Sequence, residues 1–516
     1  RIQKKSKRKI EMKSLKCAAF TDALIPVEVE STFVRGLPGF NIVGLAGATI
    51  KESESRVKAA LVSLNFKFPA SKIIINLSPS DTPKNGSHFD LAIALLIALQ
   101  KERIDGDFFV FGELGLDGSL KSTASLFSIL LFLSTKVKRA KILVPQSIAL
   151  KACTIPNYDV YAVDSLSDAV RFFLDEEFAA SRLMRETHPL FKNVVEIDGQ
   201  AYVPNRDFSL DFKDVKGQKR AKRASLIAAC GMHNILFEGS PGCGKSMCAK
   251  RIARILPPQS LGEVLLSCAY ESLNNKDVDF SALRPFRSPH HTSTRSSIFG
   301  GGSSGAKIGE VALANGGELF FDELPHFGKQ ILESLREPLE DNRILISRVN
   351  SKVEYQTKFI FVAAQNPCPC GNLFSKNLTC TCSLNDIRRY KNTISAPLLD
   401  RIDIYVAMDE TGADDRSDVC SEEMADAVLR AFRAQKARGQ SELNAKLRDE
   451  ETEKFCVCES TAREVLQTAI TRYDLSQRGV NKTLKLARTI ADLAGAEIIA
   501  KAHILEALSF RIRSEI

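Results

Sequence analysis

The sequence predicts an α/β protein of several domains: a mixed α/β domain, a second α/β domain built on a parallel sheet, and a helical C-terminal domain. Three observations predict this fold class. The 516 residues are too many for one hydrophobic core, so two to four domains are expected. From about Asp211, buried strands alternate with loops and helices, as in a parallel sheet. After about Asp409, an acidic loop leads into helical segments only.

The first domain is expected over residues 12–185. Alternating apolar residues predict strands at Ile25–Glu30 and Ile73–Leu77, and helical spacing predicts helices at Lys51–Leu64 and Phe89–Leu99. Proline and polar residues become frequent around 188–208, so residues 186–210 are expected to be a linker. The second domain is then placed at 211–408 and the helical domain at 409–516.

Composition is that of an ordinary soluble globular protein, with 44% hydrophobic and 26% charged residues. The longest apolar run, Leu91–Leu99, is shorter than the ~18 residues that span a bilayer. No signal segment is recognised, so we expect a cytoplasmic protein without a membrane partner. The net charge of +9 comes mostly from residues 1–16, which hold eight Lys/Arg and one Glu. It is therefore poor evidence for nucleic-acid binding. Because Met12 resembles a natural start, residues 1–11 are expected to be a disordered basic tail.

A phosphate-binding loop is the most specific motif. Its residues match G-x-x-x-x-G-K-[ST] in full, between an apolar strand at Ile235–Phe237 and a helix at Met247–Leu256. Its backbone N–H groups and the helix N-terminus favour phosphate, the lysine reaches the β- and γ-phosphates, and the last serine holds Mg²⁺. The predicted ATP-binding residues are Gly239, Ser240, Pro241, Gly242, Cys243, Gly244, Lys245 and Ser246.

Polar residues at the ends of later strands complete an expected hydrolytic site. Asp322 and Glu323 follow an apolar strand, where Asp322 suits the Mg²⁺ shell and Glu323 a general base. Asn366 ends a third strand and can orient water against the γ-phosphate. Arg401 lies between apolar residues and suits an arginine finger that reaches a neighbouring subunit's ATP. The alternative for Arg401 is a structural ion pair with Asp400 or Asp403.

The wider sequence resembles the magnesium-chelatase-like YifB/ComM family of AAA+ ATPases, essentially throughout from Met12. The stretches that carry the resemblance are 36–45 (GLPGFNIVGL), 51–53 (KES), 83–90 (PKNGSHFD), 284–292 (RPFRSPHHT), 366–371 (NPCPCG) and 487–493 (ARTIADL).

The resemblance implies a Lon-protease-like N-terminal domain, an AAA+ core of the branch that includes chelatases and replicative helicases, and a helical lid. It also implies a homo-hexameric ring that acts on DNA as a branch-migration helicase in recombination during natural transformation. Arg478 is the implied sensor-2 arginine, with Arg488 as the runner-up. The alternatives are the motor subunit of a magnesium chelatase and an ATP-dependent protease.

The Ser–Lys pair of Lon-type proteases does not carry over. When residues 83–88 are aligned with the Lon segment, His88 takes the place of the serine and Phe127 that of the lysine. Phenylalanine cannot act as a base, so the domain is expected to be catalytically inactive. Ser87 lies one residue away and leaves residual hydrolysis open.

Two expected insertions are candidate DNA contacts. Arg284–Gly309 is basic and rich in glycine and serine, and Arg343–Tyr355 alternates around residues 350–351 as a β-hairpin does. Their cations could contact phosphates without sequence choice, or could be solvated loop charge; they are Arg287, Arg295, Lys307, Arg348 and Lys352. For His290 and His291 we favour packing or loop ordering over metal binding.

The sequence contains thirteen cysteines, which a chain without a signal segment should keep reduced. Four of them form the pattern C-x-C-x9-C-x-C, namely Cys368, Cys370, Cys380 and Cys382. Four thiolates this close suit a structural, tetrahedral Zn²⁺. The alternative is four reduced cysteines in a loop. Cys456 and Cys458 have no second pair nearby and are expected to be helix or loop residues.

Overall fold

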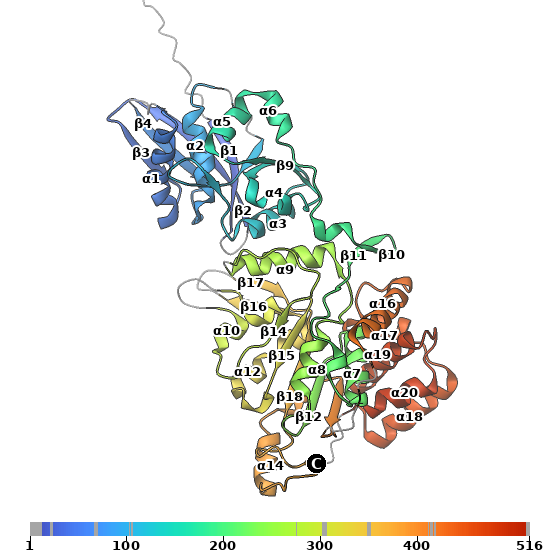
Figure 1. Cartoon of the computed structure of the whole chain (residues 1–516). Coiled ribbons are helices and arrows are strands. Elements are labelled where there is room, and N and C mark those ends of the chain that lie inside the picture. Colours follow the sequence, from blue (N-terminus) through green and yellow to red (C-terminus); the bar gives the residue numbers. More distant parts are fainter. Residues whose placement is uncertain are drawn as a thin grey trace, which may run out of the picture. The chain divides into compact units, whose positions relative to one another are not determined.

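The structure, a computed structural model, describes residues 13–20, 24–66, 71–102, 104, 107–274, 276–301, 307–347, 352–410, 412, 416 and 419–511 (Figure 1). The predicted basic tail and Met12 lie outside these ranges. The described residues form two compact units. The first ends at Lys192 and also takes in Cys268–Asp279; the second comprises the other residues from Asn193 onward.

The first unit is built on a seven-stranded sheet in the order β3-β4-β2-β1-β5-β8-β9. Its strands are β1 (Lys13–Phe20), β2 (Leu24–Val34), β3 (Gly39–Val43), β4 (Lys72–Ser78), β5 (Phe108–Val110), β8 (Ala140–Pro145) and β9 (Tyr158–Val163). Strands β1, β2 and β4 pair antiparallel, and the others join in parallel. The strands predicted at Ile25–Glu30 and Ile73–Leu77 lie within β2 and β4.

Helices of the first unit bury apolar faces in its core. They are α1 (Ala48–Ser63), α2 (Asp90–Ala98), α3 (Leu126–Ser134), α4 (Gln146–Ala152), α5 (Leu166–Leu174) and α6 (Glu176–Ser181). Helix α2 is apolar on every side, and Leu91 to Ile97 are all fully buried. The predicted helices at Lys51–Leu64 and Phe89–Leu99 thus correspond to α1 and α2. Among the described residues, no helix is long and apolar enough to cross a bilayer.

The second unit contains a five-stranded parallel sheet in the order β14-β15-β18-β12-β19. The strands are β12 (Ile235–Gly239), β14 (Phe286–Arg287), β15 (Glu318–Phe321), β18 (Ile360–Gln365) and β19 (Ile404–Met408). Every residue of β12, β15 and β18 is buried, as expected for strands covered on both faces. The predicted α/β fold with a parallel sheet is confirmed.

The segment predicted as a linker contains two strands. β10 (Val195–Ile197) and β11 (Gln200–Val203) form a hairpin, and β11 also pairs with β13 (Gln259–Ser260). Asp198 and Gly199 make the turn with φ of 51° and 71°. Asp-Gly between two strands is a strong hairpin signal, because both turn positions need positive φ. This hairpin was not predicted.

One helix precedes the strands of the second sheet, and further helices and a second hairpin follow β12 in the chain. The helices are α7 (Lys219–Gly231), α8 (Lys245–Ile252), α9 (Leu261–Leu273), α10 (Arg295–Phe299), α11 (Glu310–Leu313), α12 (Lys329–Ser334), α13 (Arg336–Asp341), α14 (Leu384–Lys391) and α15 (Ala396–Leu399). The predicted hairpin is present as β16 (Arg343–Ser347) and β17 (Lys352–Gln356), which pair antiparallel. Arg348 and the side chain of Lys352 lie outside the described part of the chain.

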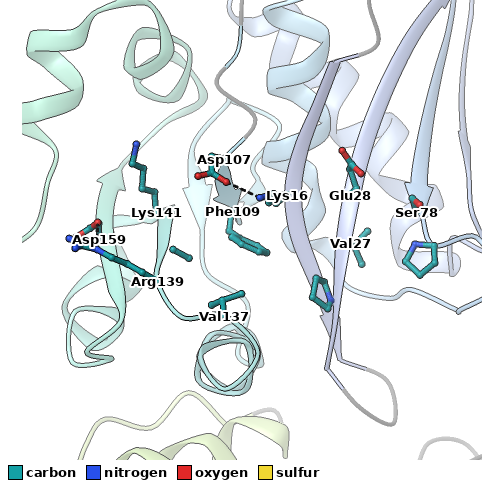
Figure 2. A pocket seen from close by; sticks show the side chains of 13 residues that line it. Lys16, Val27, Glu28, Ser78, Asp107, Phe109, Val137, Arg139, Lys141 and Asp159 are labelled. Carbon is teal, nitrogen blue, oxygen red and sulfur yellow. Dashed lines mark hydrogen bonds and ion pairs between the residues drawn. The ribbon is translucent and has the colours of Figure 1, made fainter.

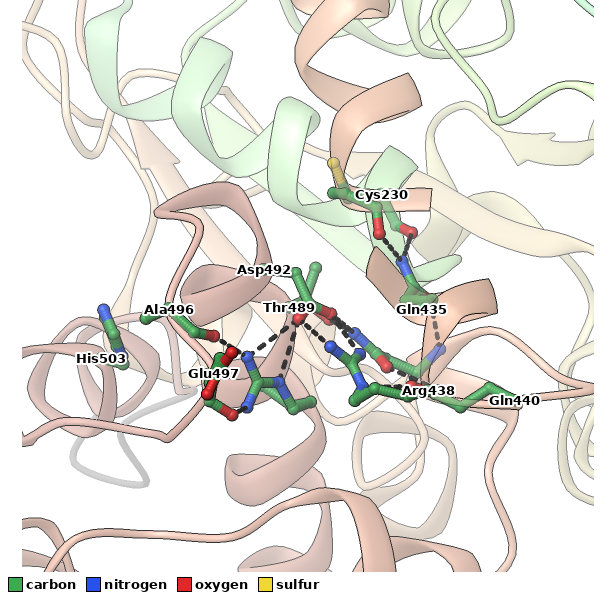
Figure 3. A network of polar contacts seen from close by, with 12 residues as sticks. Cys230, Gln435, Arg438, Gln440, Thr489, Asp492, Ala496, Glu497 and His503 are labelled. Carbon is green, nitrogen blue, oxygen red and sulfur yellow. Dashed lines mark hydrogen bonds and ion pairs between the residues drawn. The ribbon is translucent and has the colours of Figure 1, made fainter. Parts of the chain in front are cut away.

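The C-terminal segment is helical. It comprises α16 (Ser421–Ala437), α17 (Asp449–Phe455), α18 (Ser460–Tyr473), α19 (Gln477–Leu493) and α20 (Lys501–Ser509). A buried polar network joins these helices to α7 (Figure 3). Asp492 accepts two hydrogen bonds from Arg438, at 2.6 and 2.7 Å, and Gln435 donates to the carbonyl oxygen of Cys230 at 3.0 Å. Pairing with Arg438 offsets the cost of burying the Asp492 carboxylate.

Candidate functional site

The phosphate loop joins β12 to α8. Gly242 and Gly244 have φ of 81° and 97°, the left-handed region that glycine adopts without a steric cost. A Cβ atom on Gly239 would lie 2.7 Å from Cys243 Sγ and 2.8 Å from the Met408 carbonyl oxygen, so this position also requires glycine. Helix α8 begins at Lys245, so its N-terminus faces the loop. The helix ends at Ile252, earlier than the predicted Leu256.

Lys245 is held inside the loop. Its Nζ donates to the carbonyl oxygens of Gly239 and Ser240 at 2.6 and 2.9 Å, and to Asn366 Oδ1 at 3.1 Å. Burial lowers the pKa of Lys245, because desolvation disfavours its charged form. The buried Oγ of Ser240 has no hydrogen-bond partner within the described residues. A buried cation beside an unsatisfied hydroxyl is a donor set suited to a phosphate.

Oxygen donors for a magnesium ion lie next to this lysine. Ser246 Oγ donates to Asp322 Oδ2 at 2.7 Å, which brings a hydroxyl and a carboxylate together at the end of β15. Mg²⁺ prefers such oxygen ligands, so the two residues fit the ion that accompanies ATP.

Glu323 follows Asp322 and has φ of 54°, an uncommon conformation for a residue other than glycine. Its side chain is 54% exposed, and its Oε2 lies 3.8 Å from His291 Nδ1. The predicted role of His291 was packing or loop ordering, and its closeness to Glu323 was not predicted. His290 does order its loop, since its Nδ1 lies 2.8 Å from Thr292 Oγ1 and accepts from the Thr292 backbone N–H.

Asn366 lies just beyond β18, and the chain then turns back onto the phosphate loop. Gly371, with φ of 81°, lies so close to Pro241 that a Cβ atom there would be 2.7 Å from the proline Cδ. The segment that begins at Asn366 therefore touches the phosphate loop at two places: through the Asn366 side chain on Lys245, and through Gly371 on Pro241.

The structure brings the two predicted arginines together. Their contacts within the described part of the chain do not include Lys245 or Asn366. Arg401 and Arg478 each form an ion pair with Glu340. Arg478 also contacts Asp400, at 3.3 Å, whereas Asp403 pairs with Lys482 and His233. The ion pair of Arg401 is therefore with Glu340, which was neither of the two predicted carboxylates.

Arg488, the runner-up for the sensor role, is fully buried within the helical segment. Its guanidinium pairs with Asp492 at 2.9 Å and donates to the carbonyl oxygens of Ala496 and Glu497 (the network of Figure 3). Since its donors are used inside the core, this arginine suits helix packing. Arg478 is the better candidate to meet a nucleotide.

A cavity of about 590 Å³ borders the arginine pair, and Lys446, Lys482 and Lys485 line it. Desolvation lowers the pKa of Lys446 to about 8. Burial alone would raise the pKa of Asp403, but Lys482 and His233 lower it well below its usual range. Cations outnumber acids on these walls, so the cavity favours an anion.

The four predicted cysteine ligands converge. Their sulfurs all lie within 4.8 Å of one another. Cys368 Sγ lies 3.4 Å from Cys370 Sγ and 3.7 Å from Cys380 Sγ, and the last two are 3.6 Å apart. A tetrahedral Zn²⁺ with bonds of about 2.3 Å separates its sulfurs by about 3.8 Å, so the donor set fits that ion. Cys456 and Cys458 are buried around the end of α17.

The residues predicted to contact DNA differ in their exposure and in the partners they already have. Arg287 is mostly buried and lies 3.8 Å from Glu310, so it is a poor candidate for contact with a phosphate backbone. Burial lowers its pKa. Arg295 bonds to Ser334 Oγ and lies over the Phe299 ring. Lys307 is exposed, next to the undescribed residues 302–306.

In the first unit, the residues aligned with the protease pair are buried. His88 is 1% exposed, its Nε2 lies 2.9 Å from the Ala18 carbonyl oxygen, and burial lowers its pKa to about 4. Phe127 is 3% exposed. Ser87 donates to Glu113.

The same unit has a cavity of about 820 Å³ on its sheet, lined by charged and apolar side chains (Figure 2). Its cations are already neutralised in part. Lys16 pairs with Asp107 at 2.8 Å, and Arg139 pairs with Asp159 at 3.0 Å. This arrangement leaves little charge for an anionic ligand.

Comparison with known proteins matches this architecture segment by segment. The profile "Subunit ChlI of Mg-chelatase" matches residues 29–148, "Magnesium chelatase, subunit ChlI" matches 211–416, and "Magnesium chelatase, subunit ChlI C-terminal" matches 418–511. The competence protein ComM of Haemophilus influenzae is 36% identical over 500 residues, 94% of each chain. The uncharacterized protein YifB of Escherichia coli is 36% identical over 498 residues, again 94% of each chain. An uncharacterized protein of Mycobacterium tuberculosis is 33% identical over 500 residues, 94% of this chain and 95% of its own.

The parallel sheet, the phosphate loop and the family profiles define a AAA+ ATPase of the magnesium-chelatase type, a class that uses ATP and Mg²⁺. Within that class, the chain belongs to the YifB/ComM family.

Proposed function

We propose that this protein is a hexameric AAA+ motor that hydrolyses ATP to drive branch migration of DNA during recombination, as in natural transformation. The observation that carries the proposal is the pairing of Arg401 and Arg478 on Glu340, while Lys245, Ser246, Asp322 and Asn366 form a separate group. Neither Arg401 nor Arg478 is among the contacts of that group, so a nucleotide bound there would have neither arginine of its own chain beside it. A neighbouring subunit in a ring would supply both.

Each residue of the site has a proposed role. Lys245 binds the β- and γ-phosphates, and Ser246 and Asp322 hold Mg²⁺, which neutralises phosphate charge. Glu323 takes a proton from the attacking water, and Asn366 orients that water. Arg401 and Arg478 of the adjacent subunit stabilise the charge of the transition state. His291, 3.8 Å from Glu323, is placed to orient its carboxylate.

Two observations support DNA as the partner: the similarity to ComM and the two basic insertions of the second unit. ComM is called a competence protein in Haemophilus influenzae. The β16–β17 hairpin and the 284–309 segment, with the cations Arg295, Lys307, Arg348 and Lys352, are the proposed contacts with the DNA backbone. The burial of Arg287 removes it from this group.

The first unit is proposed to be a Lon-protease-like scaffold without protease activity. The burial of His88 and Phe127 supports this assignment, because neither can supply a nucleophile or a base in that setting. The helical segment from Ser421 onward is proposed to be the lid. Cys368, Cys370, Cys380 and Cys382 are proposed to bind one structural Zn²⁺.

The deciding experiment compares three possible activators of ATP turnover by the full chain: single-stranded DNA, the partner subunits of a magnesium chelatase, and an unfolded protein. Stimulation by DNA alone, together with ATP-dependent movement of a branched DNA substrate, is expected. Stimulation by the chelatase partners instead would favour the second candidate, a chelatase motor, which the names of the matching profiles also suggest. Release of peptides would identify a protease.

A further inference from the structure

Glu340 is the only acceptor that Arg401 and Arg478 share among the contacts of the described residues. It lies near the C-terminal end of α13 with 41% of its side chain exposed. Its Oε2 accepts from Arg401 Nη2 and its Oε1 accepts from Arg478 Nη2. Partial burial alone would raise the pKa of this carboxyl, but the two arginines outweigh it and lower the pKa. The carboxylate therefore stays charged and bridges both guanidinium groups.

The bridge and its neighbouring bonds fix where the two guanidinium groups lie. Arg401 Nη1 donates to the carbonyl oxygen of Pro397 at 2.5 Å, and Arg478 Nη1 donates to Asp400 Oδ2 at 3.3 Å. With Glu340 on the two Nη2 atoms, every terminal nitrogen of the pair has an acceptor. The buried Arg401 Nε has no acceptor among the described residues. Each terminal nitrogen has a second N–H group, so the bridge does not use every donor, but it holds both guanidinium groups at Glu340. An arginine that moves to the phosphate of a neighbouring subunit must break its bond to Glu340.

Glu340 is also joined closely to the proposed DNA hairpin. Only Asp341 and Asn342 separate it from Arg343, the first residue of β16. Asn342 has φ of 52° and ends α13, and Arg343 pairs across the hairpin with Glu354 at 3.2 Å. A shift of the hairpin therefore reaches the Glu340 backbone through two residues.

We propose that Glu340 is a positioning residue: it holds Arg401 and Arg478 in a standby arrangement and restrains hydrolysis by the adjacent subunit until DNA moves the hairpin. This inference rests on the proposed ring, in which both arginines act on a neighbour's ATP. The Glu340 carboxylate and a neighbouring subunit's γ-phosphate compete for the same two guanidinium groups, and charge-assisted bonds to either are strong. In one arrangement the arginines bind Glu340, and in the other they bind the γ-phosphate. The bonds are of the same kind in both, so a small displacement of Glu340 decides between them.

The test uses the full-length protein with Glu340→Gln. The amide keeps the size of the side chain but loses the charge that holds the arginines. We expect kcat without DNA to rise about fivefold or more, within the usual range of coupling between sites. The KM for ATP should not change, because the phosphate loop of each chain is untouched. Stimulation by DNA should fall by the same factor as the basal rate rises.

Two further variants keep the result interpretable. Glu337→Gln is the matched control, one helical turn earlier on α13 and exposed, and should behave as the wild type. Glu340→Ala should raise the basal rate as Glu340→Gln does. If both Glu340 variants have the basal rate of Glu337→Gln, or a lower one, the standby role is wrong.

Arg401→Ala separates this inference from the proposed function. If Arg401→Ala is impaired while Glu340→Gln matches the wild type, only the role of Glu340 fails. If Arg401→Ala turns over ATP at the wild-type rate, the proposed role of the arginine in the ring fails, and the standby arrangement fails with it.

Discussion

At the scale of single residues, the proposed chemistry rests on a carboxylate that follows β15 and a lysine that begins α8. Glu323 and Lys245 divide the work, since one is proposed to activate water and the other to bind phosphate. Glu323→Gln should leave ATP binding intact and slow turnover by ~10² to 10⁴-fold, the usual cost of losing a general base. Nucleotide binding measured by calorimetry and turnover measured by phosphate release test the two parts.

Lys245→Ala is the companion variant, and it should abolish tight binding because the phosphates lose their buried cation. Wild-type turnover in Glu323→Gln would remove that residue from its role. If Glu323→Gln lost binding as well, its carboxylate would be part of the binding site rather than the base.

The residues foreseen at this scale were those that follow a strand or belong to a continuous motif, such as Ser246 and Asp322, which contact each other at 2.7 Å. The partners of Glu323 and Arg401 were not foreseen. His291 and Glu340 are each distant in sequence from the residue they contact, and no local pattern relates the two. Only the folded chain brings such pairs together.

At the scale of elements, the segment from Asn366 to Gly371 lies on the phosphate loop. Gly371→Ala should weaken ATP binding, because its Cβ would press on Pro241 at 2.7 Å in addition to the strain of φ at 81°. Gly439→Ala is the matched control, with φ of 75° and no atom within 4 Å of the added Cβ. Both should lose about 1 kcal/mol of stability from backbone strain. Only Gly371→Ala should raise the dissociation constant for ATP, and equal constants for both would exclude the contact as a support of the loop.

The cysteine loop continues from this segment, and its proposed metal is tested directly. Protein purified without chelators should hold about one Zn²⁺ per chain by elemental analysis, since four thiolates form a closed site. The double substitution Cys380→Ser and Cys382→Ser should bring the zinc content close to zero. Zinc affinity should fall in acid, because binding requires thiolates and releases protons. Wild-type protein without metal would support the alternative of four reduced cysteines.

Helices and strands with a clear pattern of apolar residues were predicted well. A short hairpin that is marked only by its turn residues was not predicted. Helix α2 and strand β12 were found from their apolar patterns. The sequence predicts a linker where the β10–β11 hairpin lies, because proline and polar residues are frequent around it. Asp198-Gly199 was the local signal that could have revealed it.

At the scale of the whole molecule, the proposed ring makes a prediction about mixed subunits. Arg401→Ala and Lys245→Ala chains should each be inactive alone. In mixed rings, an interface can combine an intact phosphate loop from one chain with an intact arginine from the next. ATP turnover should therefore recover in part on mixing. Mixed rings verified by mass spectrometry but inactive at every ratio would contradict an arginine that acts between subunits.

The sequence predicted the α/β class and the helical C-terminal segment, but not how the units divide. Residues Cys268–Asp279 group with the first unit although they come after the phosphate loop. This grouping depends on contacts between segments far apart in the chain, and the spacing of apolar residues along the sequence does not reveal such contacts.

The strand order β14-β15-β18-β12-β19 has a consequence for synthesis on the ribosome. Every residue of strand β12 is buried, and its neighbours β18 and β19 begin only at Ile360 and Ile404. At about 5 to 20 residues per second, roughly 8 to 33 s pass between translation of Gly239 and of Ile404. Throughout that interval the nascent β12 lacks a complete set of partners. The phosphate loop is thus translated long before the sheet that supports it, so its support is complete only after β19 has been made.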